Sequence, residues 1–130
     1  AWQARIAAIG NDAAGQGVGV IAINSNDPKV VALDGYEEMQ QRARELGLRF
    51  PYVVDATSEV ARAFGATRTP EAFLFDADGK LVYHGAIDDS SQDAAAVEAH
   101  YLRDALAALI AGRPVALADT KALGCTIKFR

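Results

Sequence analysis

The sequence predicts an α/β domain with a layered sheet, and three features of the pattern carry this prediction. Residues 17–24 form an apolar run rich in Val and Ile. Residues 72–75 and 81–84 are two further apolar runs, and the Asp78-Gly79 dipeptide between them is typical of a hairpin turn. Segments with helical spacing of apolar residues precede, separate and follow these runs, and such alternation is typical of an α/β fold.

Length and composition narrow the classes of protein to consider. The chain has 130 residues, which predicts one domain over residues 1–130 with residues 115–130 as a C-terminal tail. Its net charge is −4, and its Lys and Arg residues are scattered, which argues against a nucleic-acid partner. No apolar run approaches the roughly 18 residues of a membrane span, so a membrane is not an expected partner either. The compartment stays open, with a cytoplasmic location favoured over a periplasmic one.

The first helix and strand follow from spacing and composition. Trp2, Ile6 and Ile9 lie four and three residues apart, which places them on one helix face, and residues 15–17 contain the glycines that end this helix. The run at residues 17–24 then predicts a parallel strand covered on both faces, because nearly all of it is apolar.

A second helix is expected to open at Asp34. Glu37 follows three residues later, a spacing that predicts reciprocal capping of two free amide groups. Gly47 fits the C-terminal exit. The apolar stripe of this helix consists of Tyr36, Met39, Ala43 and Leu46.

The remaining elements are a short strand at residues 50–54, a short helix at residues 58–64, the hairpin and a final helix. The final segment becomes rich in alanine from residue 94, and Gly112 and Pro114 stop the helix. A leading helix beside a buried parallel strand normally follows another strand in a right-handed crossover. The opening strand is therefore expected to be missing from the chain.

Five segments together resemble the redoxin, peroxiredoxin-like thiol-disulfide branch of the thioredoxin superfamily. They are residues 17–27, 50–52, 60–66, 69–85 and 124–129. The resemblance implies a thioredoxin-like three-layer sandwich with a central mixed sheet, in which residues 34–54 contain the insertion typical of this branch. It also implies a cis peptide bond before Pro70.

The resemblance implies a thiol-disulfide oxidoreductase or an antioxidant thiol peroxidase that needs no cofactor. Its substrate would be a protein disulfide or a peroxide, and a thiol reductant would regenerate it. A Cys-x-x-Cys pair at a helix N-terminus, where a thiolate is stabilised, is expected upstream of Ala1. The 130-residue chain alone is therefore expected to be inactive, which leaves its status as an enzyme open.

Four residues are candidates for the site. The resemblance implies that Thr69 and Pro70 contact an extended substrate segment, and that Arg68 stands where many relatives have a cysteine or a small residue. Arg68 either tunes the charge of the site or is a solvated loop residue. Cys125 is the candidate catalytic thiol, as a resolving or shielding partner. The alternative, slightly favoured, is that Cys125 is a small residue packed in the tail.

Other chemistry is not favoured. His84 is expected at a surface or rim, and neither histidine has a Cys or His at ligand spacing, so no metal is expected.

The competing function is a cysteine-less binding module that holds an extended peptide at the proline. A third alternative is that another chain supplies the missing strand, by swapping or complementation; a homodimer is one such arrangement.

Overall fold

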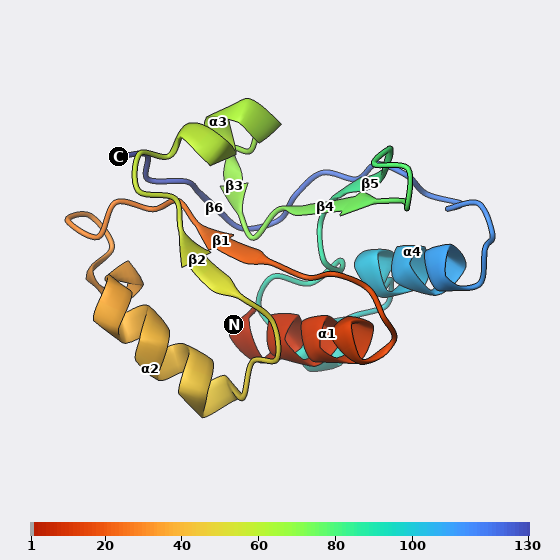
Figure 1. Ribbon diagram of the computed structural model, residues 1–130, viewed down its shortest axis with the longest axis horizontal. Helices are drawn as coiled ribbons and strands as arrows, with labels where there is room; N and C mark the ends of the chain where they lie inside the picture. The colour runs from red at the N-terminus through yellow and green to blue at the C-terminus, as the bar shows by residue number, and fades with distance from the viewer. Residues whose placement is uncertain (1) are drawn as a thin grey trace. The chain divides into compact units, whose positions relative to one another are not determined.

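The computed structural model describes residues 2–130, which divide into two compact units. The N-terminal unit consists of residues 3–67 together with residues 126–130. The hairpin unit consists of residue 2 together with residues 68–125. Each unit mixes helices with strands, and Figure 1 labels the elements of both. The one-domain organisation expected from the length stays a prediction.

The N-terminal unit begins with α1 (Gln3–Gly15), the helix expected from the first apolar residues. Its buried face carries only small residues, Ala7, Gly10 and Ala13. A side chain at Gly10 would collide with the ring of Phe50, so this glycine lets an aromatic side chain pack directly on the helix.

The predicted strand at residues 17–24 is shorter than expected. Only β1 (Ala22–Asn24) is a strand, and it pairs in parallel with β2 (Tyr52–Val54). The amide of Val18 instead donates to the carbonyl of Ala13, so this part of the run completes the end of α1. Burial of the strand on both faces is also wrong, because Ile21 and Ile23 are 59% and 40% exposed.

The second helix starts later than predicted, and its predicted cap is wrong. A 3₁₀ turn, η1 (Ala32–Asp34), precedes α2 (Tyr36–Leu46), and the residue before α2 is Gly35, which makes no side-chain capping bond. The Asp34 carboxylate instead accepts hydrogen bonds from Asn26 and Arg42, which draws it away from the helix start. Gly47 ends α2 in the left-handed conformation, as its position predicted.

The short helix α3 (Glu59–Phe64) ends at Gly65, as expected. Its start depends on the side chain of Asp55. One carboxylate oxygen accepts from the amide of Val60 and the other from the amide of Ala61, at 3.3 and 2.9 Å. The hydroxyl of Ser25 donates a third bond of 2.8 Å to Asp55.

Residues 126–130 return to the N-terminal unit and pack beside the loop after β1. The amide of Lys128 donates to Asn26 Oδ1 at 2.8 Å, and its carbonyl accepts from the amide of Asp27. The guanidinium of Arg62 lies 4.8 Å from the ring centre of Phe129. The tail therefore supplies part of the packing of this unit.

The hairpin unit contains the predicted hairpin. It begins with β3 (Arg68–Thr69), and β4 (Ala72–Phe75) then pairs in antiparallel fashion with β5 (Leu81–Gly85). The turn between them matches the Asp-Gly signal: Gly79 has φ +79°, and the Asp76 carboxylate accepts from the amides of residues 78 and 80.

The final helix is shorter than the alanine-rich segment. Residues Ala94–Ala96 form a 3₁₀ turn, η2, capped by Asp93, and α4 spans Tyr101–Ile110. The helix α4 packs beside β5. The last strand is β6 (Cys125–Thr126). The buried core of the hairpin unit consists of Leu74, Tyr83, Ala86, Ile87, Ala105, Leu106 and Ala108.

Candidate functional site

The centre of the candidate site is the proline loop, defined here as residues 68–70. Gly65 ends α3 with a positive φ, and the chain then enters β3 and reaches Pro70 through a cis peptide bond after Thr69. Thr69 is exposed, whereas Arg68 and Pro70 are half-buried. Thr69 is therefore the most accessible of the three candidate residues in this loop.

The segment before Cys125 lies against this loop. The guanidinium of Arg68 donates to the carbonyl of Gly124 at 3.3 Å. Gly124 has φ +153°, and a side chain there would collide with the carbonyl of Thr69 and approach Pro70. Only glycine therefore fits this contact. The guanidinium of Arg68 thus contacts the protein backbone, and its two expected roles, tuning the charge of the site or a solvated loop charge, stay predictions.

Cys125 follows Gly124 directly and is an exposed, free cysteine. The slightly favoured expectation, a thiol packed in the tail, is therefore wrong. Because Cys125 is exposed, its thiol is accessible to a reagent or to a second sulfur.

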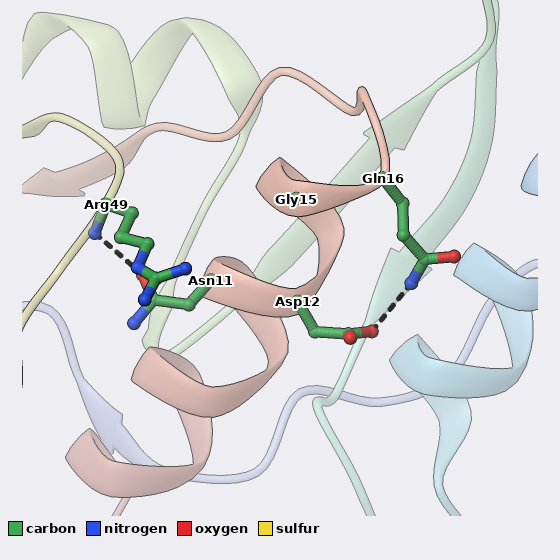
Figure 2. A pocket seen from close by; sticks show the side chains of 5 residues that line it. All are labelled: Asn11, Asp12, Gly15, Gln16 and Arg49. Atoms are coloured by element: carbon green, nitrogen blue, oxygen red, sulfur yellow. Dashed lines mark hydrogen bonds between the residues drawn. The ribbon is translucent and has the colours of Figure 1, made fainter.

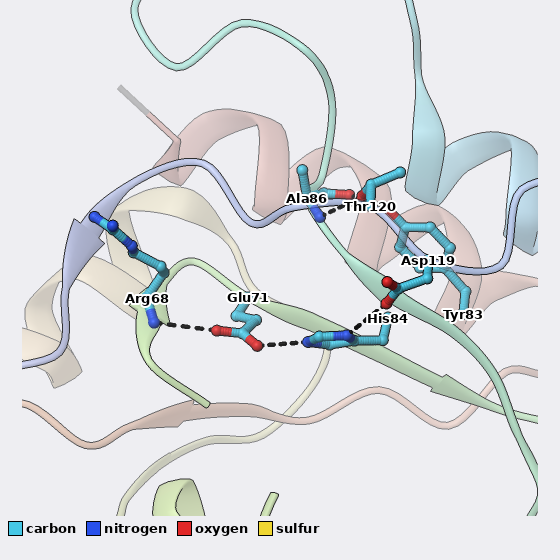
Figure 3. A network of polar contacts seen from close by, with 7 residues as sticks. All are labelled: Arg68, Glu71, Tyr83, His84, Ala86, Asp119 and Thr120. Carbon is cyan, nitrogen blue, oxygen red and sulfur yellow. Dashed lines mark hydrogen bonds and ion pairs between the residues drawn. The ribbon is translucent and has the colours of Figure 1, made fainter. Parts of the chain in front are cut away.

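A polar network next to the proline loop was not predicted from the sequence. Glu71 follows Pro70, and one of its carboxylate oxygens accepts from the amide of Arg68 at 3.1 Å. Its other oxygen lies 2.5 Å from His84 Nε2, and His84 Nδ1 lies 2.8 Å from the carboxylate of Asp119 (Figure 3). We call these three side chains the Glu71–His84–Asp119 bridge.

The bridge changes the chemistry of His84. Hydrogen bonding to Glu71 raises the pKa of the imidazole, burial opposes this, and the bond to Asp119 adds to the increase. The ring also stacks on Phe73, its cross-strand partner, with centroids 4.7 Å apart. His84 was expected at a rim without a role, but it is a partly buried link between two acidic side chains. The sequence signal that could have indicated this bridge is the glutamate directly after the predicted cis-proline.

A second set of contacts holds the segment that contains Asp119. We call residues 118–120 the strap. The amide of His84 donates to the carbonyl of Ala118, and the amide of Thr120 donates to the carbonyl of His84, both at 2.9 Å. The hydroxyl of Tyr83 donates to the carbonyl of Ala86 and lies 2.6 Å from the hydroxyl of Thr120 (Figure 3). Burial raises the pKa of Tyr83, so it acts as a neutral hydrogen-bonding group.

A surface pocket lies elsewhere, in the N-terminal unit. It is lined by Asn11, Asp12, Gly15, Gln16 and Arg49 (Figure 2). Asn11 donates to the carbonyl of Gly47 and accepts from the amide of Arg49, while Gln16 donates to Asp12. Asn11 thus joins α1 to the segment after α2, whereas the Gln16–Asp12 bond lies at the end of α1, and both contacts have a structural role.

Two absences concern residues 2–130 alone. Within that range, no three His, Cys, Asp or Glu side chains are grouped so as to hold a metal ion. None of the helices described there has the length and apolar character needed to cross a membrane.

The sequence matches one family model and several curated proteins. The model described as AhpC/TSA family matches residues 3–84. The thiol-disulfide oxidoreductase ResA of Geobacillus thermodenitrificans is 35% identical over 66 residues, which cover 51% of this chain and 34% of that protein. ResA of Geobacillus kaustophilus is 32% identical with the same coverage. The match thus spans about a third of the length of these relatives.

Two solved structures resemble nearly the whole chain. An uncharacterized conserved protein from Geobacillus kaustophilus matches with a TM-score of 0.89 and 42% identity, over 99% of this chain and 69% of that one. A hypothetical protein from Sinorhizobium meliloti 1021 matches with a TM-score of 0.89 and 37% identity, over 99% and 71%. The predicted thioredoxin-like α/β fold is thereby confirmed. The chain belongs to the AhpC/TSA family, within the redoxin branch of the thioredoxin superfamily.

Proposed function

We propose that this chain belongs to a thiol-disulfide oxidoreductase or an antioxidant thiol peroxidase, whose reacting cysteine pair precedes residue 1. The observation that carries the proposal is the combination of relatives named as thiol-disulfide oxidoreductases with a single cysteine in 130 residues. A dithiol mechanism needs two sulfur atoms, and Cys125 supplies one at most.

The reductase reaction would run in two exchanges. A thiolate of the upstream pair attacks one sulfur of the substrate disulfide, which forms a mixed disulfide and releases the other substrate sulfur as a thiolate. The second cysteine then attacks the mixed disulfide, releases the remaining substrate thiolate and leaves an oxidised pair. Two electrons from a dithiol reductant restore the pair.

The peroxidase reaction would use the same pair. A thiolate attacks a peroxide oxygen, which breaks the O–O bond, forms a sulfenic acid and releases water or an alcohol. The second thiol condenses with the sulfenic acid to give a disulfide and water. The two reactions share the resolving cysteine, the oxidised pair that it leaves and the reductant, but the resolving cysteine releases a thiolate from a mixed disulfide in the first and water from a sulfenic acid in the second.

The proline loop is the substrate contact in this proposal. Thr69 is exposed, so its backbone and that of Pro70 can lie beside an extended segment that carries a disulfide. Arg68 holds the carbonyl of Gly124, and through it the backbone next to Cys125. We assign Cys125 an accessory role, as an exposed thiol that exchanges with the upstream pair.

The test compares the protein encoded by the complete gene with residues 1–130 alone. The complete protein should reduce insulin disulfides or consume hydrogen peroxide, and replacement of either upstream cysteine by serine should abolish turnover. Residues 1–130 alone should give the background rate. Cys125→Ser should retain turnover but change the rate at which the reduced upstream cysteine pair becomes oxidised again.

Two outcomes would contradict the proposal. Turnover by residues 1–130 alone would place the chemistry on another residue. An upstream sequence without cysteines, together with binding of an unfolded peptide that depends on Thr69, would favour the peptide-binding module instead. Sedimentation of the same sample tests whether a second copy contributes a strand, because that arrangement requires a dimer.

A further inference from the structure

The Glu71–His84–Asp119 bridge joins two segments that the sequence separates widely. Glu71 belongs to the loop after Pro70, and Asp119 belongs to the strap, 48 positions later in the numbering. His84 stands between them and bonds to both carboxylates (Figure 3). The side chain of Glu71 is only 5% exposed, so its carboxylate needs hydrogen-bond donors inside the protein.

The strap does not need the bridge to stay in place. Two backbone hydrogen bonds to His84 and the Tyr83–Thr120 contact hold residues 118–120 on β5. Gly85 adds to this fit, because a side chain there would collide with Thr120. The imidazole of His84 has a different role, because it links the strap to Glu71. The other carboxylate oxygen of Glu71 accepts a hydrogen bond from the amide of Arg68.

We propose that Glu71 and His84 are positioning residues for the proline loop, which hold the backbone of residues 68–70 in the conformation that receives substrate. The fixed strap orients His84, His84 orients the Glu71 carboxylate, and Glu71 holds the Arg68 amide. This inference deepens the proposed function and rests on it, because the loop is the substrate contact assigned above.

Protonation of His84 decides whether the bridge is complete. An imidazolium donates from both ring nitrogens and satisfies both carboxylates, whereas a neutral imidazole donates from only one. The charged groups that face His84 are Glu71 from the loop and Asp119 from the strap, and Phe73 of β4 presents a neutral ring. Nearby, Tyr83 bonds to Thr120, and the Arg68 guanidinium bonds to Gly124.

The sign of the pH effect follows from the direction of the shift. The pKa of His84 is raised above its ordinary value of 6.5. The contribution of the imidazolium is therefore complete below pH 6.5 and is lost as the pH rises through the folded-state pKa. The proline loop should be best held below pH 6.5 and should loosen as the pH rises through the folded-state pKa of His84.

The experiment follows the Arg68 amide and the His84 ring by NMR in the complete protein. In the wild type, the protection factor of the Arg68 amide, corrected for intrinsic exchange, should fall about tenfold across the titration of His84, the effect of one charge-assisted hydrogen bond. His84→Gln and Glu71→Gln should show the low protection at every pH. His100→Gln, which changes the only other histidine, should behave as the wild type.

Kinetics of the same variants separate this inference from the proposed function. His84→Gln should raise KM for a disulfide-containing peptide about tenfold and leave kcat near the wild-type value, because the loop binds substrate but carries no reacting atom. A wild-type protein with coupled titration but no turnover would contradict the proposed function and support the positioning role.

Arg68 protection that stays constant while His84 titrates would overturn the inference. So would wild-type protection in Glu71→Gln. The wild-type titration needs no substitution, and it remains decisive if His84→Gln fails to fold. Asp119→Asn adds a graded test: it should lower the titration midpoint of His84 and shift the loss of Arg68 protection by the same amount.

Discussion

At the scale of single residues, Asp55 shows how one carboxylate can organise a helix start. The residue before α3, Ser58, makes no side-chain capping bond, and Asp55 accepts two amides of the first turn instead. Asp55 is only 5% exposed. Burial opposes its ionisation, but the bonds from Ala61, Ser25 and Val60 outweigh burial and hold the pKa of Asp55 below its usual range. The carboxylate also faces the positive end of a helix.

Asp55→Asn should therefore weaken the fold in a pH-dependent way. A depressed folded-state pKa gives stabilisation that is present above the ordinary value of 3.8 and is lost as the pH falls through the folded-state pKa. We expect Asp55→Asn to lower the free energy of unfolding at pH 7 by about 2 kcal/mol, the scale of hydrogen bonds to a charged group. Urea unfolding of both proteins between about pH 2 and pH 7 measures the free energy of unfolding. This range lies on both sides of the ordinary carboxyl pKa.

The matched control is Asp78→Asn, in the exposed hairpin turn. It should leave the free energy of unfolding within about 0.5 kcal/mol of the wild type. The difference between the wild type and Asp55→Asn should shrink as the solution becomes acidic. A difference that stays constant down to pH 2 would show that the charge of Asp55 contributes nothing.

At the scale of elements, α2 depends on one buried side chain. Met39 is 2% exposed, whereas Tyr36, at the start of the predicted apolar stripe, is 63% exposed. The helix packs on β2 and on α1, and Met39 is its only fully buried residue. The predicted apolar stripe therefore contains the buried residue of α2, Met39, but the stripe as a whole is less buried than expected.

Met39→Ala should lower the free energy of unfolding by about 3 kcal/mol, because a buried methionine leaves a cavity that the surrounding residues fill only in part. Gln40→Ala, at the next and exposed position, is the control and should change stability by less than about 0.5 kcal/mol. Chemical unfolding of both variants makes the comparison. Equal effects at the two positions would mean that α2 is held by its backbone and not by this contact.

The features that the sequence predicted well are those decided by neighbouring residues. Gly47, Gly65 and Gly79 have positive φ where a helix end or a turn was expected. The features that were predicted wrongly depend on hydrogen bonds to residues outside the local motif. The Asp34 side chain accepts from Asn26 and from Arg42 in the second turn of α2 and does not cap the start of that helix, and Val18 completes α1 instead of joining a strand.

The same distinction applies to the candidate site. The proline loop was identified from a local motif, Thr-Pro before an apolar strand. The Glu71–His84–Asp119 bridge was not, because His84 and Asp119 are 35 positions apart and no periodic pattern relates them. Asp119 also lies beyond residues 3–84, the part that matches the family model. Side-chain pairing at this distance has to be read from coordinates.

At the scale of the whole molecule, the hairpin unit is inserted into the N-terminal unit. The chain leaves the N-terminal unit after residue 67 and returns to it at residue 126. Asn26 secures the return, with one bond to the amide of Lys128 across 102 positions and another to Asp34. Asn26 is buried, so its side chain has few other partners available.

Asn26→Ala should therefore release residues 126–130. We expect hydrogen exchange at the Lys128 amide to accelerate about tenfold, because that amide loses its acceptor. Lys128→Ala is the matched control: it removes a side chain that bonds only to Thr126 and keeps the amide bonded to Asn26. Unchanged exchange in Asn26→Ala would show that Arg62 and Phe129 hold the tail without it.

The return of residues 126–130 also orders events during synthesis on the ribosome. The amide of Asp27 and the side chain of Asn26 are synthesised about a hundred residues before their partner Lys128. The last hydrogen bonds of the N-terminal unit can therefore form only after the whole hairpin unit has been synthesised.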